Sequence, residues 1–156
     1  LTWKAREYGV NTRFIELAGE INHHMPHWVV GKVTDALNER GKSVKGSRIL
    51  VLGLAYKKNI DDTRESPAVE IMNLLQTKGA HIDYSDPHVP LFPRKRDYHF
   101  DLQSVPISPE NIAGYDCLVL ATDHDAMDYE LLQTHAPLIV DTRGRLDGSR
   151  ANVVAA

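Results

Sequence analysis

Beyond residue 47, the chain alternates short runs of hydrophobic residues with segments in which hydrophobic positions recur at helical spacing. The short runs predict strands over residues 48–55, 80–86, 116–121 and 138–142. The pattern between them predicts a helix over 66–78, capped by Ser66 and followed by Gly79, and a second helix over 125–134. Strands that alternate with helices are typical of a parallel sheet covered on both faces. We therefore predict an α/β fold, a Rossmann-like parallel sheet sandwiched by helices.

Residues 1–41 have a different pattern, that of a long helix with an apolar stripe. Asn11 or Thr12 can cap this helix, and Pro26 is expected to kink or split it. The apolar positions recur at helical spacing: Phe14, Ile15, Leu17, Ala18, Ile21, Met25, Trp28, Val29, Val33, Ala36 and Leu37. Such a surface can pack on its own domain or pair with another chain, and a shared interface is favoured. We expect a helical joining or dimerisation segment, 1–41, and a Rossmann-like domain, 47–156.

Composition narrows the class of protein. At 156 residues, with 42% hydrophobic and 25% charged residues, the chain resembles an ordinary globular domain. The net charge of −3 argues against nucleic-acid binding, and the basic cluster 94–96 is interpreted as part of a solvated loop. Prolines make residues 87–114 mostly irregular, with a short strand near 102–107. No run of about 18 apolar residues predicts a membrane span and no signal peptide is recognised, so a cytoplasmic protein is expected.

Cysteine and histidine offer little reactive chemistry in this sequence. Cys117 is the only cysteine, so no intrachain disulfide and no cysteine-based zinc site can form. It lies in a predicted buried strand, where a thiol is inert packing, so no covalent catalyst is expected. His23, His24 and His27 could suggest a metal site, but Pro26 disturbs that turn of helix and a surface cluster is favoured. No metal is expected.

The segment from Gly53 to Pro67 follows a predicted strand and precedes a helix, a position where α/β sheets bind ligands. It has a single glycine, whereas a dinucleotide site would show G-x-G-x-x-G. Lys57, Lys58 and Arg64 offer cations that bind phosphate through side chains rather than through bare backbone. We therefore predict a phosphate-bearing ligand held by side chains, with Lys58 facing solvent rather than the ligand.

The charged residues in and after this segment have alternative roles. Asp61 and Asp62 could form a catalytic carboxylate pair, but neighbouring positions rarely converge, so electrostatic support of the helix start at Ser66 is favoured. Arg64 could pair with a nearby acid and hold the loop. Asp86 could bind a ribose hydroxyl, as in dinucleotide folds. Without the glycine motif, a cap in the Asp-Pro turn is the favoured role of Asp86.

Four segments carry a resemblance to a known family. Residues 53–67, GLAYKKNIDDTRESP, and 84–90, YSDPHVP, resemble the carboxy-terminal domain of the UDP-glucose/GDP-mannose dehydrogenase family. Residues 14–22, FIELAGEIN, are similar to the helix that joins the two halves of those enzymes, and 140–144, VDTRG, to their last core strand. The resemblance covers nearly the whole chain and implies that residues 47–156 bind a nucleotide sugar (UDP).

The resemblance implies an NAD-dependent nucleotide sugar 6-dehydrogenase, which oxidises the C6 hydroxyl of a UDP-sugar to a uronate in two steps through a cysteine thioester. The family's catalytic cysteine and amino-terminal NAD domain match no part of this chain. It is therefore expected to be a fragment that is inactive alone and contains no catalytic residue. Its expected partners are a nucleotide sugar, its own amino-terminal NAD domain and a second copy in a homodimer. Such enzymes feed polysaccharide biosynthesis.

Position by position, the resemblance assigns Tyr56 and Lys57 to the nucleotide sugar and Arg143 to the substrate side of the site. Arg64 matches an arginine that reaches the NAD held by the other domain. Lys57 and Arg143 both follow predicted strands, so both can reach one crevice.

The sugar is less clearly specified than the family. Residues 1–9 and 14–22 look most like bacterial UDP-N-acetylglucosamine or UDP-glucose 6-dehydrogenases. A UDP-N-acetylhexosamine is slightly favoured over UDP-glucose, and GDP-mannose is least favoured. An alternative function, suggested by the apolar amino-terminal helix and the missing cysteine, is a non-catalytic dimerisation or regulatory Rossmann-like module.

Overall fold

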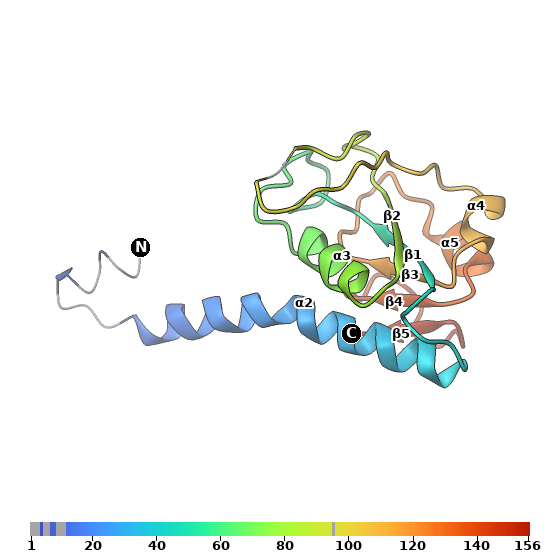
Figure 1. Ribbon diagram of the computed structural model, residues 1–156, viewed down its shortest axis with the longest axis horizontal. Helices are drawn as coiled ribbons and strands as arrows, with labels where there is room; N and C mark the ends of the chain where they lie inside the picture. Colours follow the sequence, from blue (N-terminus) through green and yellow to red (C-terminus); the bar gives the residue numbers. More distant parts are fainter. Residues whose placement is uncertain (1–3, 5–6, 9–11, 95) are drawn as a thin grey trace.

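The computed structural model describes residues 4, 7–8, 12–94 and 96–156. In this part of the chain, five strands form one parallel sheet in the order β2-β1-β3-β4-β5 (Figure 1). The strands are β1 (Arg48–Leu52), β2 (His81–Ser85), β3 (Cys117–Leu120), β4 (Ile139–Asp141) and β5 (Val153–Ala155). The helices are α2 (Arg13–Glu39), α3 (Pro67–Thr77), α4 (Pro109–Ala113) and α5 (Tyr129–His135). The predicted α/β fold is confirmed. The prediction did not include β5, because a strand of three residues is too short to give a periodicity signal.

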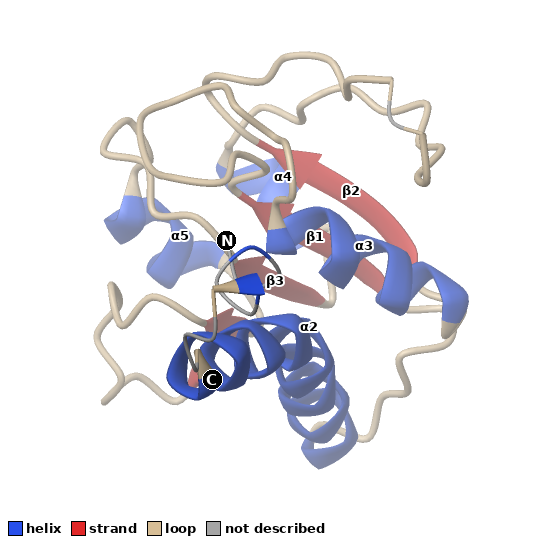
Figure 2. Ribbon diagram, turned by 90° about the vertical axis from the view of Figure 1, so that its left-hand side faces the viewer, coloured by secondary structure: helices blue, strands red, loops and turns tan. Residues whose placement is uncertain are grey.

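The sheet is the middle of three layers, with α2 and α3 on one face and α4 and α5 on the other (Figure 2). Successive side chains of β1 point to opposite faces. Val51 packs with residues of α2 and α3, whereas Leu50 and Leu52 pack with residues of α4 and α5. Because both faces are covered, the inner strands are apolar at consecutive positions rather than at every second one.

The two halves of α2 have different surroundings. The carboxyl half packs against α3, β3 and β4, and Val29, Val33 and Leu37 are almost fully buried there. The amino half extends away from the sheet domain (Figure 1). It exposes a row of large apolar side chains: Phe14, Ile15, Leu17, Ile21, Met25 and Trp28. No helix in the described part of the chain is long and apolar enough to cross a membrane.

Pro26 does not split α2, which continues unbroken from Arg13 to Glu39. A proline inside a helix removes one backbone hydrogen bond and costs about 3 kcal/mol. Each large apolar side chain that the following residues bury contributes about 1.5–3 kcal/mol, so packing outweighs that cost. At the start of the helix, Thr12 occupies the N-cap position, but its hydroxyl donates to Glu16 at 2.9 Å instead of accepting a backbone N–H. Asn11 lies outside the described residues.

The proline-rich segment is more ordered than predicted. It contains the short helix α4, which Ser108 caps by accepting a hydrogen bond from the N–H of Asn111 at 3.2 Å. The strand expected near 102–107 is present only as isolated bridges. The two arginines of the basic cluster 94–96 are exposed, as expected for a solvated loop, and Lys95 lies outside the described residues.

The order of the strands creates a topological switch between β1 and β3. The chain crosses from β1 through α3 to β2 on one side, and then returns to β3 on the other side. The loops after β1 and β3, residues 53–66 and 121–128, therefore meet at the carboxyl edge of the sheet, the usual ligand position in this architecture. The first loop ends at Ser66, which caps α3 as predicted by accepting a hydrogen bond from the Ala68 N–H.

Candidate functional site

Gly53 begins the loop 53–66 and allows it to touch the loop 121–128. Its φ is +82°, a conformation that favours glycine. A Cβ at this position would lie 2.3 Å from the carbonyl oxygen of Thr122. Thr122 also donates a hydrogen bond from Oγ1 to the carbonyl of Ala55 at 2.7 Å. The single glycine of the loop therefore serves close contact between two loops rather than approach to a phosphate.

Asn59 joins the same two loops farther along the chain. Its side-chain amide donates to Asp125 Oδ2 at 2.6 Å, and its Oδ1 accepts from the Asp125 N–H at 3.0 Å. Lys58 pairs with Asp125 Oδ1 at 2.9 Å, and this contact lowers the pKa of the carboxyl. The protein's own side chains thus bridge the switch point. Outward-facing side chains of the two loops remain exposed at this edge, and the predicted ligand contacts are assigned to such side chains.

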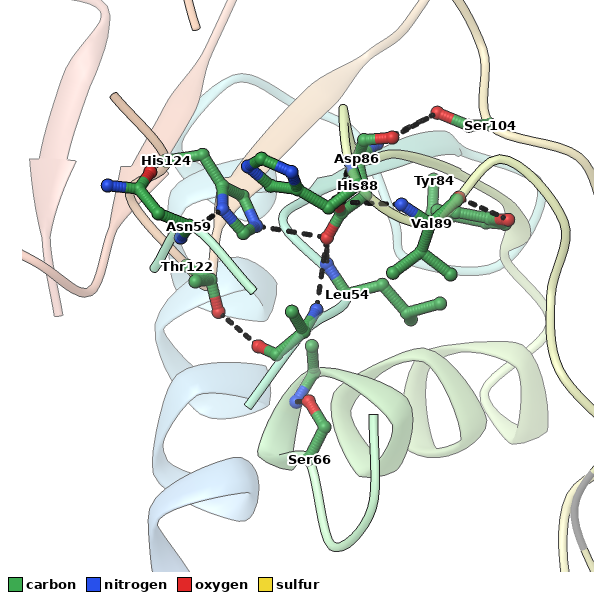
Figure 3. Close-up of polar contacts among 12 residues, drawn as sticks. Leu54, Asn59, Ser66, Tyr84, Asp86, His88, Val89, Ser104, Thr122 and His124 are labelled. Carbon is green, nitrogen blue, oxygen red and sulfur yellow. Dashed lines mark hydrogen bonds and ion pairs between the residues drawn. The ribbon is translucent and has the colours of Figure 1, made fainter. Parts of the chain in front are cut away.

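Asp86 follows β2 and is buried, and its carboxylate accepts hydrogen bonds from three segments (Figure 3). Oδ2 accepts from the N–H groups of Leu54 and Ala55 at 2.6 and 3.0 Å. Oδ1 accepts from the N–H groups of His88 and Val89 at 2.8 and 3.2 Å. A histidine of the loop 121–128 provides a fifth contact. The carboxylate is saturated within the chain, which supports the cap and leaves no lone pair for a ribose hydroxyl.

His124 provides that fifth contact, and the sequence pattern did not single it out. Its side chain is fully buried, with Nε2 at 3.0 Å from Asp86 Oδ2 and Nδ1 at 2.8 Å from the backbone nitrogen of Asn59. A backbone N–H can only donate, so Nδ1 accepts and the ring proton lies on Nε2, which donates to Asp86. The one available signal was position, because the residue lies just beyond the carboxyl end of a predicted strand.

Tyr56 and Lys57 are exposed on the loop 53–66. The ammonium of Lys57 lies 5.3 Å from the centroid of the Tyr56 ring, a cation–π arrangement. None of the described carboxylates forms an ion pair with Lys57. An exposed ammonium without an acid to neutralise it is available to an anionic ligand.

The two arginines that the resemblance assigns to ligands each contact an aspartate. Arg64 binds Asp62 through Nε–Oδ1 at 3.0 Å and Nη2–Oδ2 at 2.7 Å, and these hydrogen bonds raise the pKa of Arg64. Arg143 Nε lies 3.1 Å from Asp123 Oδ1. Arg143 therefore borders the loop 121–128, which the first loop contacts as well. The ion pair that holds Arg64 is the structural role considered from the sequence.

Asp62 shapes the loop that leads to α3. Its Oδ1 accepts from the Arg64 N–H at 2.9 Å, and its carbonyl accepts from the Tyr56 N–H at 2.7 Å. These contacts close the loop on itself before the helix begins. Because the guanidinium of Arg64 engages both oxygens of the Asp62 carboxylate, the arrangement gives no support to a catalytic pair with Asp61.

The remaining candidates lie away from this edge or are inert. Cys117 is buried, and burial raises its pKa to about 12, so the thiol stays protonated at neutral pH. His23, His24 and His27 are exposed on α2, with His24 Nδ1 at 3.0 Å from the carbonyl oxygen of Glu20. Within the described ranges, no three acidic, histidine or cysteine side chains gather as a metal site would require.

Comparison with known proteins identifies a family. Residues 50–148 match the UDP-glucose/GDP-mannose dehydrogenase family, UDP binding domain. The UDP-N-acetyl-D-mannosamine dehydrogenase of Methanococcus maripaludis is 36% identical over 124 residues, covering 80% of this chain and 26% of that protein. The enzyme of the same name from Escherichia coli is 33% identical over 140 residues, covering 85% of this chain and 32% of that protein. The chain thus spans about a quarter to a third of the length of these relatives.

Solved structures agree with this result. A UDP-D-ManNAc dehydrogenase from Pyrococcus horikoshii has a TM-score of 0.73 and 26% identity, over 93% of this chain and 33% of that one. A GDP-mannose dehydrogenase from Pseudomonas aeruginosa shares the fold, with a TM-score of 0.74 at 22% identity, over 99% of this chain and 36% of that one. The chain therefore belongs to the UDP-glucose/GDP-mannose dehydrogenase family, and its sheet domain is the family's UDP binding domain.

Proposed function

We propose that this chain is the nucleotide-sugar-binding part of an NAD-dependent nucleotide sugar 6-dehydrogenase, which oxidises the C6 hydroxyl of a UDP-sugar to a uronate in two steps. The observation that carries the proposal is the family match over residues 50–148, which include the exposed Tyr56 and Lys57. NAD accepts the hydrides of such a reaction and is assigned to another domain of the enzyme. The role of this chain is to bind and orient the nucleotide sugar.

The substrate proposed for the whole enzyme is UDP-N-acetylmannosamine. Both relatives described above are named UDP-N-acetyl-D-mannosamine dehydrogenases. These names agree with the expected N-acetylhexosamine, but they do not support UDP-N-acetylglucosamine or UDP-glucose as the specific sugar. That finer choice rested partly on residues 1–9, most of which lie outside the described residues.

Lys57 and Arg143 are proposed to supply positive charge to the pyrophosphate of the nucleotide sugar. Lys57 is free to do so, and Arg143 can turn from Asp123 to the ligand because its side chain is 52% exposed. A hydrogen bond to a charged group contributes about 1.5–3 kcal/mol. Loss of either side chain should therefore weaken binding by about tenfold or more. Tyr56 is proposed to present its ring to the same ligand.

Arg64 is proposed to reach the NAD held by the other domain. Its side chain is 88% exposed, so it can contact a neighbouring surface. The contact with Asp62 uses Nε and Nη2, which fixes the plane of the guanidinium and leaves Nη1 for a ligand. The structural role and the proposed cofactor role are therefore compatible.

A second copy of the chain is proposed to cover the amino half of α2 in a homodimer. This half, which extends away from the sheet domain, is called the outer half of α2 below. The exposed apolar row described above includes Phe14 at 89% and Trp28 at 56% exposure, and an apolar face of this kind marks an interaction surface. The same observation favours the second candidate function, a dimerisation or regulatory module without nucleotide binding. Nucleotide titration separates the two candidates, because a module of that kind would form dimers but bind no UDP.

Calorimetric titration of this chain tests the proposal. UDP, UDP-N-acetylmannosamine, UDP-N-acetylglucosamine, UDP-glucose, GDP and NAD are compared at low and at high salt. We expect UDP and its sugars to bind, with affinity that falls as salt rises, and Lys57→Ala to weaken UDP binding by about tenfold or more. The control is Lys78→Ala, which removes an exposed lysine just after α3, at the opposite edge of the sheet.

Two results would contradict the proposal. If UDP and its sugars do not bind, the chain is not a binding unit and the module becomes the better account. If Lys57→Ala and Lys78→Ala weaken UDP binding equally, the effect is one of net charge and Lys57 has no specific role.

A further inference from the structure

We propose that His124 is a positioning residue of the nucleotide-sugar site, because it holds the backbone of Asn59 and thereby fixes the segment that carries Tyr56 and Lys57. This inference rests on the proposed function, since it concerns how the same loop presents its side chains to the ligand. His124 itself is buried and does not face the ligand.

Two buried side chains hold this segment, Asp86 at its first end and His124 at its far end. Asp86 Oδ2 accepts the N–H groups of Leu54 and Ala55, which precede Tyr56. The same oxygen receives the Nε2 proton of His124 at 3.0 Å, and the other ring nitrogen accepts the N–H of Asn59 at 2.8 Å (Figure 3). The imidazole therefore holds the far end of the segment through its acceptor nitrogen.

Asn59 needs such a partner because of its backbone conformation. Its φ is +62°, in the left-handed region that non-glycine residues rarely adopt, and this costs about 1–3 kcal/mol unless the surroundings hold it. The hydrogen bond to His124 and the two side-chain contacts with Asp125 provide that hold. Lys57 has no ion pair with a described residue, so its position depends on this backbone.

His124 has two further neighbours, a ring beside its imidazole and a hydroxyl on its main-chain carbonyl. The His88 ring lies 4.9 Å away, between centroids, and the hydroxyl of Tyr129 donates to the carbonyl of His124 at 2.6 Å. Both ring nitrogens have partners of opposite kind, one acceptor and one donor. The arrangement therefore places the ring proton on Nε2, with Nδ1 as the acceptor.

Two substitutions of His124 separate its two contacts. In His124→Asn the side-chain oxygen can take the place of Nδ1 and accept the N–H of Asn59, while the contact with Asp86 is lost. In His124→Gln the amide nitrogen can take the place of Nε2 and donate to Asp86, while Asn59 loses its acceptor. His88→Asn is the matched control, because it removes the neighbouring exposed imidazole and neither of these hydrogen bonds.

Two measurements are made on each folded variant: amide hydrogen exchange across residues 54–62 and affinity for UDP. We expect His124→Gln to exchange faster in this segment, with the sheet strands unchanged, and to bind UDP about tenfold more weakly, as for one lost hydrogen bond. His124→Asn and His88→Asn should keep the exchange and the affinity of the parent within about twofold. A merely structural histidine would instead give equal losses in the Asn and Gln variants.

A second pair of variants keeps the test decisive if changes at the buried ring prevent folding. Asn59 is exposed, so it can be changed without disturbing the core. Asn59→Gly keeps the positive φ and the N–H donated to His124, whereas Asn59→Val disfavours that φ. Asn59→Val is expected to loosen the segment and weaken UDP binding about tenfold relative to Asn59→Gly.

The outcomes distinguish this inference from the proposed function. If His124→Gln or Asn59→Val loosens the segment but leaves UDP affinity unchanged, the positioning role is overturned and the proposed function stands. If the parent chain itself binds no UDP, the proposed function fails together with the positioning role. Equal exchange in all variants would overturn the anchoring of the segment directly.

Discussion

The carboxyl edge of the sheet and the outer half of α2 differ in how far their side chains find partners within this one chain. At the carboxyl edge, polar groups find partners across three loops, and no buried side-chain nitrogen or oxygen among the described residues lacks a hydrogen bond. On the outer half of α2, large apolar side chains lie in solvent, and Leu17, Ile21 and Trp28 are each at least half exposed. The loop 53–66 is therefore positioned by the chain itself, whereas the outer half of α2 leaves an apolar surface exposed.

This difference predicts different responses to substitution. Changes at the carboxyl edge should act on the stability and ligand affinity of a single chain, because its contacts are internal. Changes on the outer half of α2 should act on association between chains and leave the fold intact.

The largest effect is expected for Gly53→Ala. A methyl group there would lie 2.3 Å from the Thr122 carbonyl oxygen at a φ of +82°, so both sterics and backbone strain oppose it. We expect a loss of at least about 3 kcal/mol in the free energy of unfolding, measured by urea denaturation. Gly148→Ala is the control, because nothing lies within 4 Å of its added Cβ. Equal stability of the two variants would show that the loops do not meet as described.

A somewhat smaller loss is expected for Asp86→Asn. An amide in place of the carboxylate turns its NH2 group toward backbone N–H donors, and each buried donor left unpaired costs about 1–3 kcal/mol. The expected loss is about 2–4 kcal/mol in the free energy of unfolding. Asp101→Asn, on an exposed residue, is the control and should be close to neutral. If Asp86→Asn is equally neutral, the carboxylate is not the hub of these loops.

The sequence predicts the parts of this structure that depend on neighbouring residues. The strand and helix pattern, the Ser66 cap and the position of Lys57 just after a strand all follow from local pattern or position. The contacts that complete the carboxyl edge do not, because they join distant positions: the partners Asn59 and His124 are 65 residues apart. A buried histidine shows its role only when the loops that it joins are seen together.

Pro26 and Arg143 illustrate the same limit. Whether a proline breaks a helix depends on what the following turns pack against, and here the sheet domain supplies that packing. Position after a strand predicts that Arg143 lies at the carboxyl edge. That position does not predict the contact with Asp123, which lies in the loop 121–128 after the neighbouring strand β3.

A change on the outer half of α2 should affect assembly alone. Ile21→Asp places a charge in the middle of the exposed apolar row, so the proposed dimer should dissociate into monomers in sedimentation equilibrium, while the unfolding free energy of the monomer changes by less than about 0.5 kcal/mol. Asn22→Asp is the control, because this substitution adds the same carboxylate at an exposed position beside the apolar row. A parent chain that is already monomeric would contradict the proposed dimer surface.

The smallest effect concerns the Lys58 contact at the carboxyl edge. Lys58 and Asn59 bind the Asp125 carboxylate, so its pKa lies below the usual value in the folded protein. The stabilisation is present above the usual aspartate pKa of about 3.9 and is lost as pH falls through the lower folded-state pKa. The thermal unfolding midpoints of the parent and Asp125→Asn should therefore differ slightly at about pH 7 and converge once the pH lies below the lowered pKa of Asp125. Ile21→Asp is a control, because it does not alter the contact between Lys58 and Asp125. The difference between its unfolding midpoint and that of the parent should not follow the titration of Asp125. A difference between parent and Asp125→Asn that persists at low pH would mean that the side-chain amide of Asn59, and not the charge of Lys58, makes the contact between the loops.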